Sequence, residues 1–73
     1  MVDITLLRQK IKDKGITLEE LADKLGMSRS TLYRKLLEDG RNLSLKEISG
    51  IISELALSEQ ETSIIFFRNL SQK

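Results

Sequence analysis

Apolar residues recur every three or four positions along most of the chain, which is the spacing of one face of an α-helix. Ile4, Leu7 and Ile11 form one such stripe, and Leu32 and Leu36 lie one turn apart in another. A further stripe comprises Leu45, Ile48, Ile51, Ile52 and Leu55. Strand-like alternation of apolar and polar residues is too short to compete, and the chain contains no proline. The pattern therefore predicts an all-α fold.

Capping residues and glycines divide the chain into five short helices. Three Ser or Thr residues are each followed three positions later by Glu, the signature of a capping box. The predicted helix starts are Asp3, Thr17, Ser28, Ser44 and Ser58, and the predicted stops are Gly15, Gly26 and Gly40. We expect the last helix to cover about 59–70, and Gly50, inside the fourth helix, to mark a close helix crossing. Since so short a chain cannot enclose two cores, residues 1–73 are expected to form a single domain.

Residues 17–36 contain what two short helices need in order to pack nearly at right angles. Ala22 is a small residue on the inner face of the first helix, and Gly26 lets the chain reverse four residues later. Ser28 then starts the second helix. Apolar residues available for packing between them are Leu21, Leu25, Met27, Leu32 and Leu36. The segment therefore predicts a helix-turn-helix at about 17–36.

This segment, LADKLGMSRSTLYRKL, resembles the helix-turn-helix of the phage Cro and repressor family, also called xenobiotic-response-element-type regulators. The residues that carry the resemblance are Ala22, Gly26, Met27, Ser28 and Leu32. Residues 45–57 and the capping box after them are also similar to that family. The resemblance implies a five-helix, lambda-repressor-like DNA-binding domain. It also implies a Cro-like transcription regulator, a repressor in particular, encoded by a phage or prophage.

Charge is concentrated around the predicted turn, although the whole chain carries only +1. Residues 24–46 contain six basic and two acidic side chains, a net +4, so the remainder carries −3. The basic residues are Lys24, Arg29, Arg34, Lys35, Arg41 and Lys46. A local basic patch on a nearly neutral protein favours a specific polyanion contact over a general one.

The second helix of the motif would enter the major groove, where each base pair presents a distinct pattern of donors and acceptors. With Leu32 and Leu36 inward, Ser30 and Arg34 form a ridge on the opposite side. By resemblance, the residues at the base-reading positions are Arg29, Ser30 and Arg34. Arginine can donate two hydrogen bonds to guanine, so we expect Arg34 and Arg29 to read guanine. Tyr33 could contact a thymine methyl or a phosphate, and the alternative for all four residues is a solvated helix face.

Contacts to phosphates are expected on either side of this helix, where they set the register without reading sequence. The candidates are Thr17, Ser28, Lys35, Arg41, Asn42 and Lys46. One position departs from the family, which often has glutamine at the first residue of the second helix to bind a phosphate. Leu18 occupies that position here, so this contact is lost unless backbone amides replace it.

Four consecutive apolar residues near the end of the chain, Ile64, Ile65, Phe66 and Phe67, span about 300° of a helix. A small domain cannot bury all four, and exposed apolar surface commonly marks an interface. We therefore predict a homodimer on DNA that uses the fifth helix, with Leu57 as a further candidate. Two such copies would bind half-sites about 34 Å apart on a pseudo-palindromic operator. In the alternative, two of the four residues pack inward and the others merely lie on the surface.

The composition argues against several other classes of protein. The chain has neither histidine nor cysteine, so a metal site or a catalytic nucleophile–base pair is not expected. No cofactor, small-molecule ligand or catalysis is predicted. No apolar run reaches membrane-spanning length and no signal-peptide layout opens the chain, which predicts a cytoplasmic protein. Two alternatives on the same fold remain open: an antitoxin, and a protein-interaction module that does not bind DNA.

Overall fold

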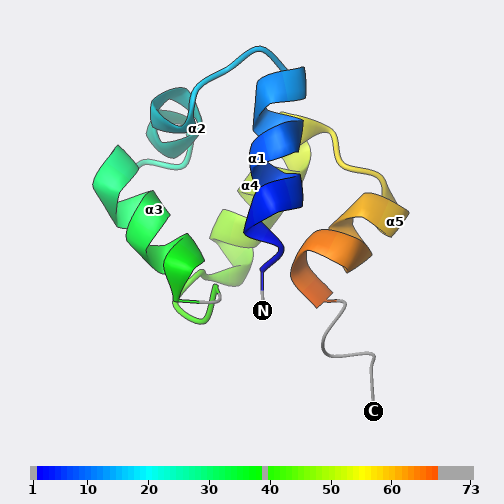
Figure 1. Cartoon of the computed structure of the whole chain (residues 1–73). Coiled ribbons are helices and arrows are strands. Elements are labelled where there is room, and N and C mark those ends of the chain that lie inside the picture. The colour runs from blue at the N-terminus through cyan, green and yellow to red at the C-terminus, as the bar shows by residue number, and fades with distance from the viewer. Residues whose placement is uncertain (1, 39, 68–73) are drawn as a thin grey trace.

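The structure is a computed structural model that describes residues 2–38 and 40–67. Helices account for its regular secondary structure (Figure 1): α1 (Ile4–Asp13), α2 (Leu18–Lys24), α3 (Arg29–Leu37), α4 (Leu45–Leu55) and α5 (Glu59–Thr62), which continues as the π-helical turn η1 (Ser63–Phe67). The predicted all-α fold of five helices is confirmed for this part of the chain. The end of the predicted last helix, from residue 68 to 70, lies outside the described residues.

Each helix starts at the capping residue predicted from the sequence. Asp3 Oδ1 accepts a hydrogen bond from the backbone N–H of Leu6 at 3.0 Å, and Ser28 Oγ accepts one from Thr31 at 3.2 Å. The capping boxes that begin at Thr17, Ser44 and Ser58 have both of their reciprocal hydrogen bonds. These bonds satisfy backbone donors that a helix leaves unpaired in its first turn. Because each bond joins residues three positions apart, the start of each helix could be predicted from a few neighbouring residues.

The turn between α2 and α3 is fixed by the backbone around Gly26. Gly26 has φ +77°, the left-handed conformation that glycine adopts without steric cost. Its N–H donates to the carbonyl of Asp23 at 3.0 Å, and the N–H of Met27 donates to the carbonyl of Ala22 at 3.0 Å. This pair of bonds is a Schellman motif, which ends α2 and turns the chain sharply into α3. The predicted helix-turn-helix is therefore present.

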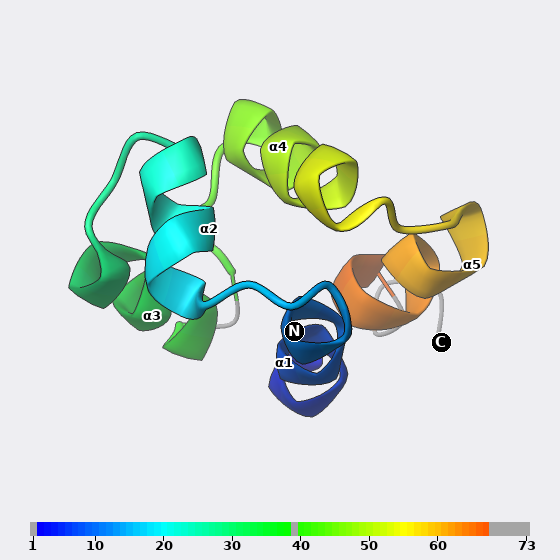
Figure 2. The same ribbon diagram turned by 90° about the horizontal axis from the view of Figure 1, so that it is seen from above.

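The helices enclose one apolar core. The α2–α3 pair lies on one side of α1 and α5 on the other, with α4 across the core from α1, as the two views of the ribbon show (Figures 1 and 2). Fully buried side chains come from α1, α2, α3, α4 and η1: Leu7, Leu21, Leu32, Ile51 and Ile65. None of the described helices is long and apolar enough to cross a membrane.

The C-terminal part of the chain closes the core against α1. The N–H of Asp3 donates to the carbonyl of Ile65 at 2.8 Å, and Lys10 of α1 forms an ion pair with Glu61 of α5. Ile65 and Phe66 are buried by this arrangement, at 0% and 6% exposure. α5 and η1 are thus part of the folded unit.

One residue of the predicted apolar stripes is not in the core. Leu45, the first residue of α4, is 81% exposed, whereas Ile51 and Leu55 on the same stripe are buried. A helical side chain leans toward the N-terminus of its helix, so the side chain of a first residue extends past the end of the helix. The spacing placed Leu45 on the correct stripe, but the core does not reach that far along α4.

Candidate nucleic-acid interface

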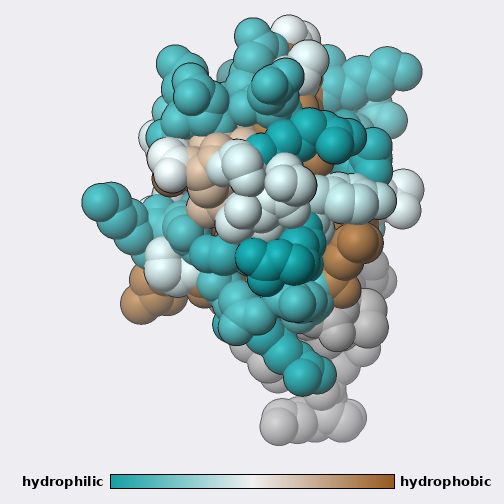
Figure 3. Space-filling view, turned by 90° about the vertical axis from the view of Figure 1, so that its left-hand side faces the viewer, coloured by the Kyte–Doolittle hydropathy of each residue, from teal (hydrophilic) through white to brown (hydrophobic). Residues whose placement is uncertain are grey.

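The two faces of α3 differ sharply. Leu32 and Leu36 are buried, while Arg29, Ser30 and Arg34 are exposed. No acidic residue occurs within α3, the first being Glu38 at its end. Hydrophilic residues cover most of the side of the molecule on which α2 and α3 lie (Figure 3). Three of the side chains predicted to read bases, Arg29, Ser30 and Arg34, are therefore solvent-exposed, and two of them carry positive charge.

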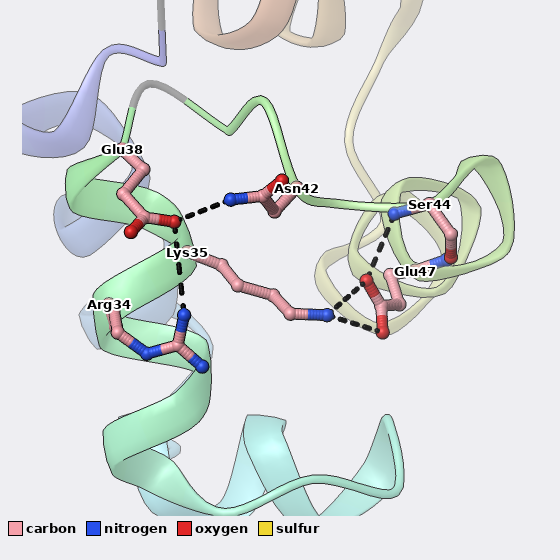
Figure 4. A network of polar contacts seen from close by, with 6 residues as sticks. All are labelled: Arg34, Lys35, Glu38, Asn42, Ser44 and Glu47. Atoms are coloured by element: carbon pink, nitrogen blue, oxygen red, sulfur yellow. Dashed lines mark hydrogen bonds and ion pairs between the residues drawn. The ribbon is translucent and has the colours of Figure 1, made fainter.

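Arg34 is held only weakly by its own chain. Its side chain is 60% exposed, and its Nη1 lies 3.9 Å from Oε1 of Glu38, which is an ion-pair distance but too long for a hydrogen bond (Figure 4). Exposed ion pairs of this kind contribute about 0.2–1 kcal/mol. The guanidinium can therefore leave Glu38 for a stronger partner.

Tyr33 lies beside two arginines, one from its own helix and one from α1. The Cζ of Arg29 is 5.9 Å from the centroid of the Tyr33 ring, and the Cζ of Arg8 is 5.8 Å from it. Both distances are within the range of a cation–π interaction. Sequence reasoning did not select Arg8, because nothing local in the sequence indicates that this residue of α1 meets α3.

Lys35 is engaged within the protein. Its Nζ lies 3.1 and 3.2 Å from the two carboxylate oxygens of Glu47, which also accepts the backbone N–H of Ser44 at 3.0 Å (Figure 4). The backbone hydrogen bond from Ser44, followed by the bond from Lys35, lowers the pKa of Glu47 below its ordinary value. Glu47 thus couples the start of α4 to α3, and the ammonium group of Lys35 is already paired.

Asn42 is likewise occupied, since its Nδ2 donates to Oε1 of Glu38 at 2.7 Å (Figure 4). Arg41, in the same connection, and Lys46, in the first turn of α4, are exposed. Neither of their side chains forms a hydrogen bond or ion pair with the residues at 2–38 and 40–67. Of the predicted phosphate contacts, these two cations are the most available.

Thr17 and Ser28 serve as helix caps. Thr17 Oγ1 accepts the N–H of Glu20 at 3.0 Å and remains exposed, so its hydroxyl can still donate outward. The hydroxyl of Ser28 donates to Thr31 Oγ1 at 2.9 Å while accepting from the Thr31 backbone. Ser28 therefore uses its hydrogen-bonding capacity to start α3.

The four apolar residues predicted at the dimer interface separate into two pairs. Ile65 and Phe66 are buried in the core of their own chain, and they are not on the surface for a second copy to contact. Ile64 is partly exposed and Phe67 is 39% exposed. The π-helical turn at Ser63–Phe67 sets this division.

Comparison with known proteins agrees with this geometry. Residues 7–61, about three quarters of the chain, match the family model described as helix-turn-helix. Neither the curated proteins nor the solved structures gave a significant match. The matched stretch contains α2, the turn at Gly26, α3 and α4. The chain therefore belongs to the helix-turn-helix family of the Cro and repressor type, whose members are DNA-binding regulators.

Proposed function

We propose that this protein is a Cro-like transcription repressor of phage or prophage type, which binds a specific operator by inserting α3 into the major groove. The observation that carries the proposal is that Arg29, Ser30 and Arg34 of α3 are exposed and that α3 contains no acidic residue, the first being Glu38 at its C-cap. A carboxylate within this helix would repel the phosphates that line the groove. The buried side chains of Leu32 and Leu36 pack the helix against the core of the protein.

Arg34 is the principal base-reading residue in this proposal. Two parallel hydrogen bonds from its guanidinium to O6 and N7 of guanine are worth about 1–3 kcal/mol of discrimination against other bases. This exceeds the contribution expected from its exposed contact with Glu38, about 0.2–1 kcal/mol. Arg29 reads a second guanine from the start of α3, and Ser30 contributes a weaker contact.

Backbone contacts then set the register. Arg41 and Lys46 are the exposed cations of the α3–α4 connection and of the first turn of α4. Thr17 adds a hydroxyl donor at the start of α2. Because phosphates carry no sequence information directly, these residues contribute affinity for every duplex.

The operator is expected to be pseudo-palindromic and bound by two copies of the chain. Phe67 and Ile64 are the apolar side chains that η1 leaves exposed or partly exposed, and Leu57, partly buried, precedes α5. Exposed apolar groups of this kind are commonly covered in an interface. Two-fold symmetry then separates the two recognition helices by about 34 Å, one turn of DNA.

Selection of tight-binding sequences from random duplex DNA tests the proposal. We expect an enriched sequence with two inverted half-sites, one helical turn apart between centres. Arg34→Ala should enrich the same sequence with one base position per half-site relaxed. Failure of the wild-type chain to enrich any sequence at low salt would contradict DNA binding. An unchanged sequence from Arg34→Ala would contradict only the role of that side chain.

The dimer requires its own measurement, sedimentation of the protein on the selected duplex. Phe67→Glu should reduce the stoichiometry from two chains to one at protein concentrations that saturate the wild-type complex. Ser53→Glu, which adds the same charge at an exposed position of α4, is the matched control and should leave two chains bound. Two bound chains of Phe67→Glu would contradict this interface.

A further inference from the structure

The ring of Tyr33 joins the recognition helix to a basic side chain of α1. The guanidinium carbons of Arg8 and Arg29 lie 5.8 and 5.9 Å from the same ring centroid. The two charges are therefore at most about 12 Å apart, the sum of these distances. Tyr33 is partly buried, whereas both arginines are exposed, so the charged groups are accessible to a ligand.

Neither arginine is neutralised within the described part of the chain. The ion pairs found there involve Lys10, Arg34 and Lys35, and no carboxylate lies within 4.0 Å of the guanidinium of Arg8 or Arg29. The attraction of each cation to the face of one ring is what holds these like charges near each other. A bound anion would reduce the repulsion between them.

The surroundings of Arg8 also suit an anion. An open hollow between α1 and the start of α2 is lined by Thr5, Arg8, Gln9, Ile11, Lys12, Gly15, Ile16 and Leu18. The lining contains two cations, two polar side chains and no carboxylate. The side chain of Leu18, at the first position of α2, has no group that can bind a phosphate. Arg8 and Lys12 are the charged groups that line this hollow.

We infer that Arg8 binds a phosphodiester group of the DNA backbone, and that Tyr33 is the positioning residue that holds Arg8 and Arg29 in their relative places. The inference rests on the proposed insertion of α3 into the major groove. That groove is about 12 Å wide, so a separation of at most about 12 Å between the two guanidinium groups allows Arg29 to face a base while Arg8 faces a phosphate of the groove wall. α1 thereby joins the DNA interface.

Binding of wild-type protein and of Arg8→Gln to the selected operator, measured across a range of salt concentrations, tests the phosphate contact. One lost phosphate contact should make the slope of log K against log salt shallower by about 0.9. Affinity should fall by a similar factor for specific and non-specific duplexes, because a phosphate contact does not read sequence. Lys14→Gln is the matched control, since it removes one exposed positive charge from the C-cap of α1, which lines a different hollow from Arg8.

The positioning role of Tyr33 has a readout in the free protein. Tyr33 is the only tyrosine of the chain, which contains no tryptophan. Ring currents should shift the side-chain NMR signals of Arg8 upfield in the wild type and in Tyr33→Phe, and the shift should vanish in Tyr33→Leu. Tyr33→Phe should also bind the operator as the wild type does, whereas Tyr33→Leu should bind more weakly and with a shallower salt slope.

The outcomes separate this inference from the proposed function. A wild-type chain that binds its operator while Arg8→Gln and Lys14→Gln show equal salt slopes overturns the role of Arg8 alone. An Arg8 signal that is the same in Tyr33→Leu as in the wild type overturns the positioning role. A wild-type chain that binds no duplex overturns the proposed function and the inference with it.

Discussion

Gly50 of α4 lies directly against Leu25, the residue that ends α2: a Cβ added to Gly50 would lie 2.6 Å from Leu25 Cδ2. Real Cβ contacts are essentially never this short, so a side chain at position 50 would force a shift. The glycine that the sequence marked inside a helix therefore has a packing reason. It lets α4 approach the end of α2 just before the turn into the recognition helix.

We expect Gly50→Ala to raise the free energy of unfolding by clearly less than the gain of about 1 kcal/mol that alanine has over glycine inside a helix. The side chain of Leu25 must turn aside, and because Cδ2 is the end of a flexible, partly buried side chain, this shift costs less than the about 1–3 kcal/mol of overpacking a core. In a Leu25→Ala background the obstructing atom is gone, so the same change should raise stability by about 1 kcal/mol. Urea unfolding of the four proteins, followed by circular dichroism, measures this coupling. Equal effects of Gly50→Ala in both backgrounds would show that the two residues do not interact.

Ala56 ends α4 in a conformation that suits glycine better. It has φ 50° and ψ 47°, and it is the only non-glycine residue with positive φ in the described part of the chain. Left-handed backbone costs an L-residue about 1–2 kcal/mol, while a glycine loses about 0.5–1 kcal/mol more entropy on folding. Ala56→Gly should therefore raise the free energy of unfolding by about 0.5–1 kcal/mol.

The control for Ala56→Gly is Ser49→Gly, which adds a glycine at an exposed position inside α4. The backbone at Ser49 is helical, so the added glycine costs conformational entropy and relieves no strain. The free energy of unfolding should therefore fall by about 0.5 kcal/mol. Changes of opposite sign in the free energy of unfolding of the two variants would confirm that the backbone conformation at Ala56 is strained. A fall in stability with Ala56→Gly would contradict it.

Features that depend on near neighbours in sequence were predictable, and those that depend on how helices are oriented were not. Thr17 and Glu20 are three residues apart, so their capping box follows from the sequence alone. The contact of Arg8 with Tyr33 and the ion pair of Lys35 with Glu47 require the packing of α1 or α4 against α3. No spacing rule within one helix specifies such partners.

The ends of elements show the same limit. The first three helices are each followed by a glycine with positive φ, as the sequence indicated. The end of α4 has no such signal, because an alanine adopts the left-handed conformation there. The pattern likewise required that some of residues 64–67 be exposed, but only the π-helical turn and its packing on α1 decide that Ile65 and Phe66 are inside.

The ion pair between Lys10 and Glu61 should make stability depend on pH at both extremes. The hydrogen bond from Lys10, followed by the backbone hydrogen bond from Ser58, lowers the pKa of Glu61 below its ordinary value of 4.5. The bond to Glu61 raises the pKa of Lys10 above its ordinary 10.5. A carboxylate whose pKa is lowered by folding stabilises the folded protein at pH values above its pKa in the unfolded chain. This stability is lost as the pH falls through the pKa that the group has in the folded protein. A raised ammonium pKa contributes stability that is lost as pH rises through the folded value.

In Glu61→Gln the melting temperature should therefore fall less steeply with pH than in the wild type. This applies to the acid arm of the profile, below about pH 4.5, and to the alkaline arm, above about pH 10.5. Glutamine can still complete the capping box with Ser58, so the helix start is retained. Glu20→Gln, at the corresponding position of the Thr17 box, should leave the alkaline arm unchanged. If the alkaline arm is also unchanged in Glu61→Gln, the carboxylate of Glu61 does not raise the pKa of Lys10 in solution.

Lys35 and Arg41 should differ in their effect on DNA binding, although both were selected from the sequence as phosphate contacts. Arg41 is exposed, and the ammonium of Lys35 is bound by both oxygens of Glu47. Arg41→Gln should weaken binding to all duplexes alike and make the slope of log K against log salt shallower by about one. Lys35→Gln should leave that slope unchanged and lower the free energy of unfolding by about 1 kcal/mol or less, since it breaks a partly exposed ion pair.

The double variant Lys35→Gln, Glu47→Gln separates the two possible roles of Lys35. It restores electrical neutrality at the contact between α3 and α4, and glutamine at position 47 can still bond to Ser44. Salt titrations of the single and double variants should therefore give the wild-type slope. A slope that falls by about one in Lys35→Gln, and stays lowered in the double variant, would mean that Lys35 leaves Glu47 when DNA is bound. In that case the phosphate is the stronger partner, and the ion pair between α3 and α4 exists only in the free protein.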